Sequence, residues 1–136
     1  MGAWGVKSFD NDDALDWIGK IETLGDASLL QSTLETIANC AFSDDLAFQD
    51  AALPIAAAEV VSALKGSPAE DLPEEITDWV KKHDIPKSIQ TELVQLALKA
   101  LGRIRIDSEL KELWEETQYA EAWHSEIMAL EARLAL

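Results

Sequence analysis

The aspartates near the N-terminus have the spacing with which a calcium-binding loop begins, because Asp10, Asp12 and Asp13 offer carboxylate oxygens within four positions. A calcium loop of this type also needs a glycine at its sixth position and a glutamate at its twelfth. Counted from Asp10, those positions hold Leu15 and Ile21. The calcium interpretation therefore fails, and we expect Asp10 or Asp12 to cap the first helix, where the helix dipole favours anions.

A second pair of residues, Glu121 and His124, has the Glu-x-x-His spacing that di-iron helical bundles use. Such a centre needs a second pair of this kind, but Val80 stands where the glutamate before His83 would be. Neither histidine belongs to a motif with serine or cysteine, and the sequence lacks a glycine-rich phosphate loop. We therefore predict no metal, no cofactor and no catalytic residue, and we expect His124 to be an exposed neighbour of a buried Trp123.

Glu59 has the most unusual sequence environment, because it is the one charge between Asp50 and Lys65. This composition predicts a buried helix. A carboxylate buried there must find hydrogen-bond donors or stay protonated. We predict that the N-terminal arm supplies the donors, from backbone N–H groups near Trp4 or from the indole of Trp4 or Trp17, so that Glu59 pins the arm. The alternatives are a functional pocket around Glu59 and simple exposure of its side chain.

The composition is that of a single globular domain, residues 1–136, with a substantial core. Hydrophobic residues make up 48% of the chain, and most of its five tryptophans must be buried, since each covers about 150–250 Å². No apolar run approaches the roughly 18–20 residues of a membrane span, and no signal peptide is evident. We therefore expect a cytoplasmic protein that binds no membrane, with Cys40 as a small core residue.

Acidic residues dominate both ends of the chain. The net charge is −15, with ten acids and two bases in residues 1–50, eight and two in residues 107–136, and eight and seven between these segments. This balance disfavours binding to nucleic acid, because phosphate contacts need lysine and arginine. A basic protein partner would be steered toward the two ends, although an excess of acid can also serve solubility alone.

Apolar residues recur at helical spacing from Ala14 onward, and no stretch alternates apolar and polar residues for long. The predicted fold class is all-α: a single compact domain of six or seven helices, with an extended N-terminal arm, residues 1–10, packed on it. The expected anchors of the arm are Trp4, Phe9, Trp17 and Glu59. The expected helices span about 12–24, 28–41, 48–65, 72–83 and 84–105, followed by one that begins near Ser108 and one that carries Trp123.

Several motifs along the chain resemble those of one family. They are Gly2-Ala3-Trp4-Gly5, then Phe9-Asp10-Asn11-Asp12-Asp13-Ala14 with Trp17, Ala56-Ala57-Ala58-Glu59, Leu72-Pro73 with Trp79, and Ser108-Glu109-Leu110-Lys111-Glu112-Leu113-Trp114. In these motifs, which extend over nearly the whole chain, the sequence is similar to the family catalogued as domain of unknown function 4259. The resemblance implies a small, mostly bacterial, helical protein, and it implies no known activity, cofactor or catalytic residue.

Three functions stay open on the sequence alone, as does the oligomeric state. The leading hypothesis is a non-enzymatic interaction module, such as an immunity-type inhibitor of a basic, nuclease-like toxin, because the chain is small, acidic and without catalytic motifs. The acids expected to contact such a partner are Asp44, Asp45, Glu112, Glu115, Glu116 and Glu121. One alternative is a structural homo-oligomeric scaffold with the second and third helices in its interface. The other is a metal-dependent or small-molecule enzyme with a cleft lined by Asp10, Asp12, Asp13 and Glu59.

Overall fold

The computed structural model of the chain describes residues 9, 12–24, 26–38, 48–69, 72–83, 85–106 and 114–135. In this part of the chain every regular element is an α-helix, and the helices form a compact domain, which confirms the predicted all-α class. The helices are α1 (Asp12–Leu24), α2 (Ala27–Ala38), α3 (Phe48–Leu64), α4 (Glu74–Lys82), α5 (Lys87–Ile106) and α7 (Ala120–Ala135).

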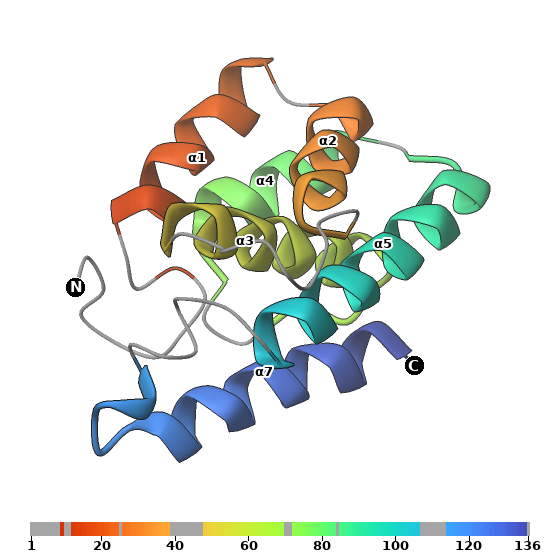
Figure 1. Cartoon of the computed structure of the whole chain (residues 1–136). Helices are drawn as coiled ribbons and strands as arrows, with labels where there is room; N and C mark the ends of the chain where they lie inside the picture. Colours follow the sequence, from red (N-terminus) through yellow and green to blue (C-terminus); the bar gives the residue numbers. More distant parts are fainter. Residues whose placement is uncertain are drawn as a thin grey trace.

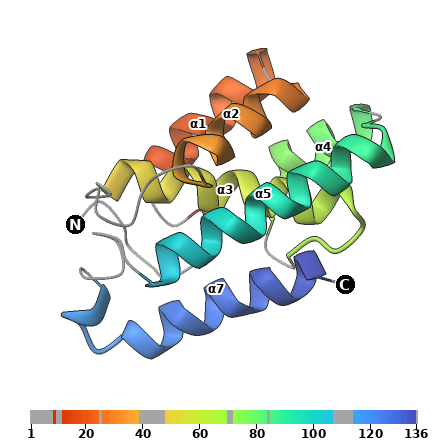
Figure 2. The same cartoon turned by 45° about the vertical axis from the view of Figure 1, so that its right-hand side comes forward.

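Helix α3 lies at the centre of the fold (Figure 1) and packs against α1, α2, α4, α5 and α7. Helix α5 crosses this arrangement and contacts α2, α3 and α7. Figure 2 shows α7 along the lower edge of the molecule, with α3 and α5 above it and α1 and α2 at the top. A helix with neighbours on so many sides has little surface left for solvent, so its sequence must be apolar nearly all round.

The sequence of α3 meets that requirement. Every residue from Pro54 to Ala63 is buried, and the consecutive alanines Ala56, Ala57 and Ala58 are each 0% exposed. Alanine has no side chain beyond Cβ, so neighbouring helices can approach the α3 backbone closely. Pro54 lies inside the helix and removes one backbone hydrogen bond there. Residues 54–63 of α3 are therefore covered by other helices of the same chain.

A glycine ends α3. The φ angle of Gly66 is +96°, in the left-handed region that glycine adopts without strain. Its N–H donates to the Ala63 carbonyl at 3.1 Å, and the N–H of Ser67 donates to the Ser62 carbonyl at 2.9 Å. These two bonds satisfy carbonyl groups that would otherwise lack a partner at the end of the helix, and they turn the chain sharply away from α3.

Side-chain capping and proline set two other boundaries. Asp26 caps α2, because its Oδ1 accepts hydrogen bonds from the N–H groups of Ser28 at 2.9 Å and Leu29 at 3.3 Å. Helix α5 begins at Lys87, three residues later than the sequence predicts. The reason is Pro86, since a proline restricts the residue before it to an extended conformation and suits the start of a helix itself.

Several predictions concern residues outside the described part of the chain, among them most of the N-terminal arm, including Trp4, the core position of Cys40, and the sixth helix up to Leu113. None of the described helices is both long enough and apolar enough to cross a lipid bilayer.

We expect Ala57→Leu to lower the free energy of unfolding by about 2–3 kcal/mol, because three extra carbon atoms must enter a packed interior. The matched control is Ala122→Leu, the same change at an exposed position of α7, which should alter stability by less than about 0.5 kcal/mol. Urea denaturation followed by circular dichroism measures both. Equal midpoints for the two variants would show that α3 is not enclosed.

Candidate functional site

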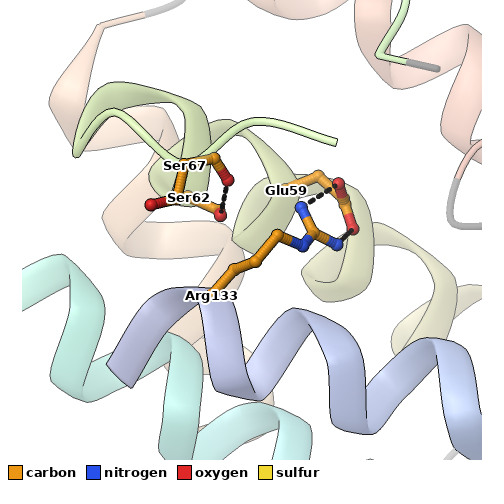
Figure 3. Close-up of polar contacts among 4 residues, drawn as sticks. All are labelled: Glu59, Ser62, Ser67 and Arg133. Atoms are coloured by element: carbon orange, nitrogen blue, oxygen red, sulfur yellow. Dashed lines mark hydrogen bonds and ion pairs between the residues drawn. The ribbon is translucent and has the colours of Figure 1, made fainter. Parts of the chain in front are cut away.

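The polar centre of the molecule is an ion pair between the middle of α3 and the end of α7. Glu59 is 3% exposed and stands among apolar neighbours on α3. Arg133 reaches it from α7, with Nη2 donating to Oε1 at 3.0 Å and Nη1 donating to Oε2 at 3.3 Å (Figure 3). Two parallel bonds between a guanidinium and a carboxylate fix orientation as well as distance. The pair therefore determines how α7 lies on α3.

A second ion pair joins α7 to α5. The Nε of Arg105 donates to Oε1 of Glu131 at 2.8 Å, and its Nη2 lies 3.5 Å from Oε2. These side chains are 35% and 22% exposed, so solvent screens them more than it screens Glu59. The ammonium group of Lys65, just beyond the end of α3, also donates to the Leu134 carbonyl. Three polar contacts thus hold α7 against α3 and α5.

The other buried polar side chains of the described residues are Ser62 and Arg103, and the two half-buried histidines pack against tryptophans. The Ser62 hydroxyl donates to the Ser67 carbonyl across the turn after α3 (Figure 3). Arg103 of α5 is buried. Each histidine packs against a tryptophan of its own helix or helix end: His83 stacks on Trp79 with 4.2 Å between ring centroids, and His124 meets Trp123 edge-on at 5.0 Å. In these positions the histidines contribute packing.

The alternative of a metal-dependent enzyme gains no support from the described residues. Among them, no three histidine, cysteine, aspartate or glutamate side chains come close enough to hold a metal ion. Asp10 and the side chain of Asp12 lie outside the described residues, and Asp13 is half-buried at the start of α1. Both carboxylate oxygens of Glu59 accept hydrogen bonds from Arg133.

The structure describes three of the four predicted anchors of the N-terminal arm. Phe9 is half-buried and packs against the core, and Trp17 of α1 is 2% exposed. The indole Nε1 of Trp17 has no hydrogen-bond partner among the described residues, so of the alternative donors that the sequence offered for Glu59 this one is not used. Arg133, which the sequence analysis did not name, supplies donors to Glu59 instead. Trp4 lies outside the described residues, so pinning of the arm by Glu59 stays a prediction.

The six acids predicted to contact a partner fall into two sets. Asp44, Asp45 and Glu112 lie outside the described residues. Glu115, Glu116 and Glu121 are all exposed and lie on the segment that leads into α7. We call residues 115–121 the acidic turn. Neither Glu116 nor Glu121 forms an ion pair with any residue in the described part of the chain.

Two buried tryptophans and a threonine fix the conformation of the acidic turn. Trp114 before it and Trp123 after it are 5% and 2% exposed. The Thr117 hydroxyl donates to the Trp114 carbonyl at 2.7 Å and accepts from the Tyr119 N–H at 3.1 Å. The Trp123 N–H then donates to the Tyr119 carbonyl at 3.0 Å, which starts α7. The turn is therefore anchored at both ends, and its acids keep a defined spacing.

Tyr119 is a residue of this surface that the sequence analysis missed. Its side chain is 52% exposed beside Glu116 and Glu121 in sequence. Tyrosine is common at the centres of protein interfaces, because its ring is rigid, apolar and ends in a hydroxyl group. The only signal in the sequence was that it is the one tyrosine and lies at a predicted break between helices.

Comparison with known proteins agrees with the resemblance found in the sequence. A family model with the description "Domain of unknown function (DUF4259)" matches residues 2–126. Neither a curated protein nor a solved structure matches the chain.

We expect Arg133→Ala to lower the free energy of unfolding by about 3 kcal/mol, because it leaves the buried Glu59 carboxylate without its guanidinium partner. The control is Arg105→Ala, which removes a more exposed ion pair and should cost less than about 1 kcal/mol. Urea is the suitable denaturant, since guanidinium salt would screen both pairs. Equal losses of stability would mean that other donors satisfy Glu59.

The predicted pinning of the arm is tested by Glu59→Ala. If the arm depends on Glu59, the variant should be less stable and the amides of residues 2–9 should exchange with solvent faster in hydrogen-exchange mass spectrometry. Arg133→Ala serves as the comparison, because it disrupts the ion pair and leaves the carboxylate in place. Unchanged exchange of residues 2–9 in Glu59→Ala would refute the pinning.

Proposed function

We propose a binding function for this chain, which belongs to the family described as Domain of unknown function (DUF4259). In this proposal the protein binds a basic protein through the acidic turn and performs no chemistry of its own. The family description assigns no activity, so the proposal depends on the surface of this chain. The single observation that carries it is a set of exposed carboxylates and an exposed tyrosine on a turn anchored by two buried tryptophans.

The distribution of cations supports an acidic binding surface. All three arginines of the chain are used internally: Arg103 is buried, and Arg105 and Arg133 form ion pairs with glutamates of the same chain. The exposed cations in the described part of the chain are therefore lysines. With a net charge of −15, the long-range field of the protein accelerates encounters with basic partners and repels acidic ones.

The composition of the acidic turn suits a protein partner better than a simple counter-ion. Glu116 and Glu121 offer carboxylates to lysine or arginine, and Tyr119 adds an apolar ring that a partner can cover. Because phosphates would be repelled by the same carboxylates, nucleic acid is an unfavourable ligand. A protein that itself binds nucleic acid through a basic surface is the complementary partner.

These arguments favour an immunity-type inhibitor, which would cover the basic substrate-binding surface of a nuclease-like toxin. The carboxylates of the acidic turn would occupy the positions of phosphate groups on that surface. We also propose a cytoplasmic location, where Cys40, the one cysteine of the chain, would stay reduced.

The test compares two double variants with equal net charge. Glu116→Gln/Glu121→Gln removes two acids from the acidic turn, and Glu74→Gln/Glu75→Gln removes two exposed acids from α4. A basic protein captured by the wild-type chain should bind the first variant about tenfold more weakly, a loss of about 1.4 kcal/mol. Its affinity for the second variant should change by less than about threefold, since long-range attraction alone is altered.

A nuclease assay of the captured protein, with and without the wild-type chain, then tests inhibition. Binding should weaken as salt is raised, because the contact is between opposite charges. Failure to capture any protein whose binding depends on the acidic turn would overturn the proposal, as would equal losses in the two double variants.

A further inference from the structure

Helix α7 has two different faces. Its inner face packs on the core through Trp123, Ile127, Leu130 and Leu134, all buried. On the opposite side, every exposed residue from Ser125 to the end of the helix is uncharged. We call these residues the outer face of α7: Ser125, Met128, Ala129, Ala132 and Ala135.

An uncharged outer face is unexpected on a surface helix of a chain in which 27% of residues are charged. Helices at the surface of a monomer normally direct charged or polar side chains away from the core. Met128 is the most exposed large apolar side chain of the described residues, at 60%. The residues around it are serine and alanine, which permit close approach of a second helix.

A pocket lies at the C-terminal end of the same helix. It has a volume of about 600 Å³ and is formed between α5, the end of α3 and the end of α7. Two lysines, Lys65 and Lys87, line it together with Gln90, Gln95 and Ala135. Lys87 is exposed and has no carboxylate partner in the described part of the chain. Lys87 is therefore an exposed positive charge at the pocket of an otherwise acidic protein, and a carboxylate would suit it.

From these two features we propose that α7 binds α7 of a second copy of this chain in an antiparallel arrangement centred on Met128. Residues of an α-helix rise 1.5 Å each, so Glu121 and Ala135 both lie about 10.5 Å from Met128 along the axis. A two-fold axis at Met128 therefore places Glu121 opposite Ala135 of the second copy, beside the pocket that contains Lys65 and Lys87. By symmetry this contact forms twice.

Charge complementarity identifies the second copy as the occupant. Glu121 is exposed and has no partner in the described part of its own chain, whereas Lys87 needs an acid. A basic partner would be repelled by the two lysines, and an unrelated acidic peptide would leave the outer face of α7 uncovered. Two chains of net charge −15 repel at long range, so the dimer is weak and forms only as concentration rises.

The dimer and the proposed basic partner compete for Glu121, but their other contacts differ. Met128 and Ala132 lie outside the acidic turn, and Glu116 and Tyr119 lie outside the outer face of α7. Substitutions can therefore separate the two functions. A loss of self-association with intact binding of a basic protein, or the reverse, would show which of the two fails.

The first experiment measures the mass of the full chain by sedimentation equilibrium over a range of concentrations. Wild-type protein should pass from monomer to dimer as concentration rises to about 1 mM, the range of weak complexes. Ala132→Glu places an unpaired carboxylate in each half of the interface, about 6 Å from its centre, and should weaken the dimer at least about tenfold. Ser32→Glu adds the same charge on exposed α2 and should leave the dimer unchanged. A wild-type chain that stays monomeric, or a dimer unaffected by Ala132→Glu, overturns the proposal.

A charge exchange tests the contact at the pocket. Lys87→Glu and Glu121→Lys should each weaken the dimer, because each places like charges opposite one another. The double variant restores opposite charges in both copies of the contact, so its dissociation constant should return to within about threefold of the wild-type value. A double variant that associates no better than the single variants would refute the antiparallel register.

Discussion

The ion pair between Glu59 and Arg133 is the constraint on which the arrangement of the helices depends. Helix α3 must be apolar nearly all round because it touches α1, α2, α4, α5 and α7, yet it carries one carboxylate in its buried stretch. Once that carboxylate is out of water, it requires a partner with donors in a fixed geometry. A bidentate arginine meets this requirement. The position of the last helix is thereby linked to the burial of the central one.

Arginine and lysine occupy different positions in this protein: the arginines are buried or form ion pairs, and the lysines supply the charge at the surface. Arginine keeps its charge, forms paired hydrogen bonds and is less strongly hydrated than lysine, so it suits buried or half-buried pairs. Arg105 and Arg133 have this role, Arg103 is buried, and lysines supply the exposed positive charge. The protein therefore withdraws part of its positive charge from the surface. Because Arg105 and Arg133 each pair with a glutamate, the net charge left to the rest of the surface stays strongly negative.

Local sequence patterns were sufficient to predict the described helices, apart from the start of α5, whereas the contacts between distant residues were not predictable from them. The bounds of α1 and the end of α3 follow from aspartates, apolar spacing and a glycine, which act over a few residues. The isolation of Glu59 in an apolar segment likewise indicated burial. Its partner, Arg133, lies 74 positions away, and the pairing depends on how α7 crosses α3. The exposure of Tyr119 depends in the same way on how Trp114 and Trp123 dock.

The internal use of charge also explains why the outer face of α7 is uncharged. Glu131 and Arg133 lie on opposite flanks of the helix, where one pairs with α5 and the other with α3. These charges hold the chain together and are unavailable to solvate the outer face. From Ser125 onward that face consists of small side chains and Met128, so another helix can approach it without removing a charge from water. The ion pairs that fix α7 within one chain thus leave the outer face of α7 uncharged and suited to bind a second chain.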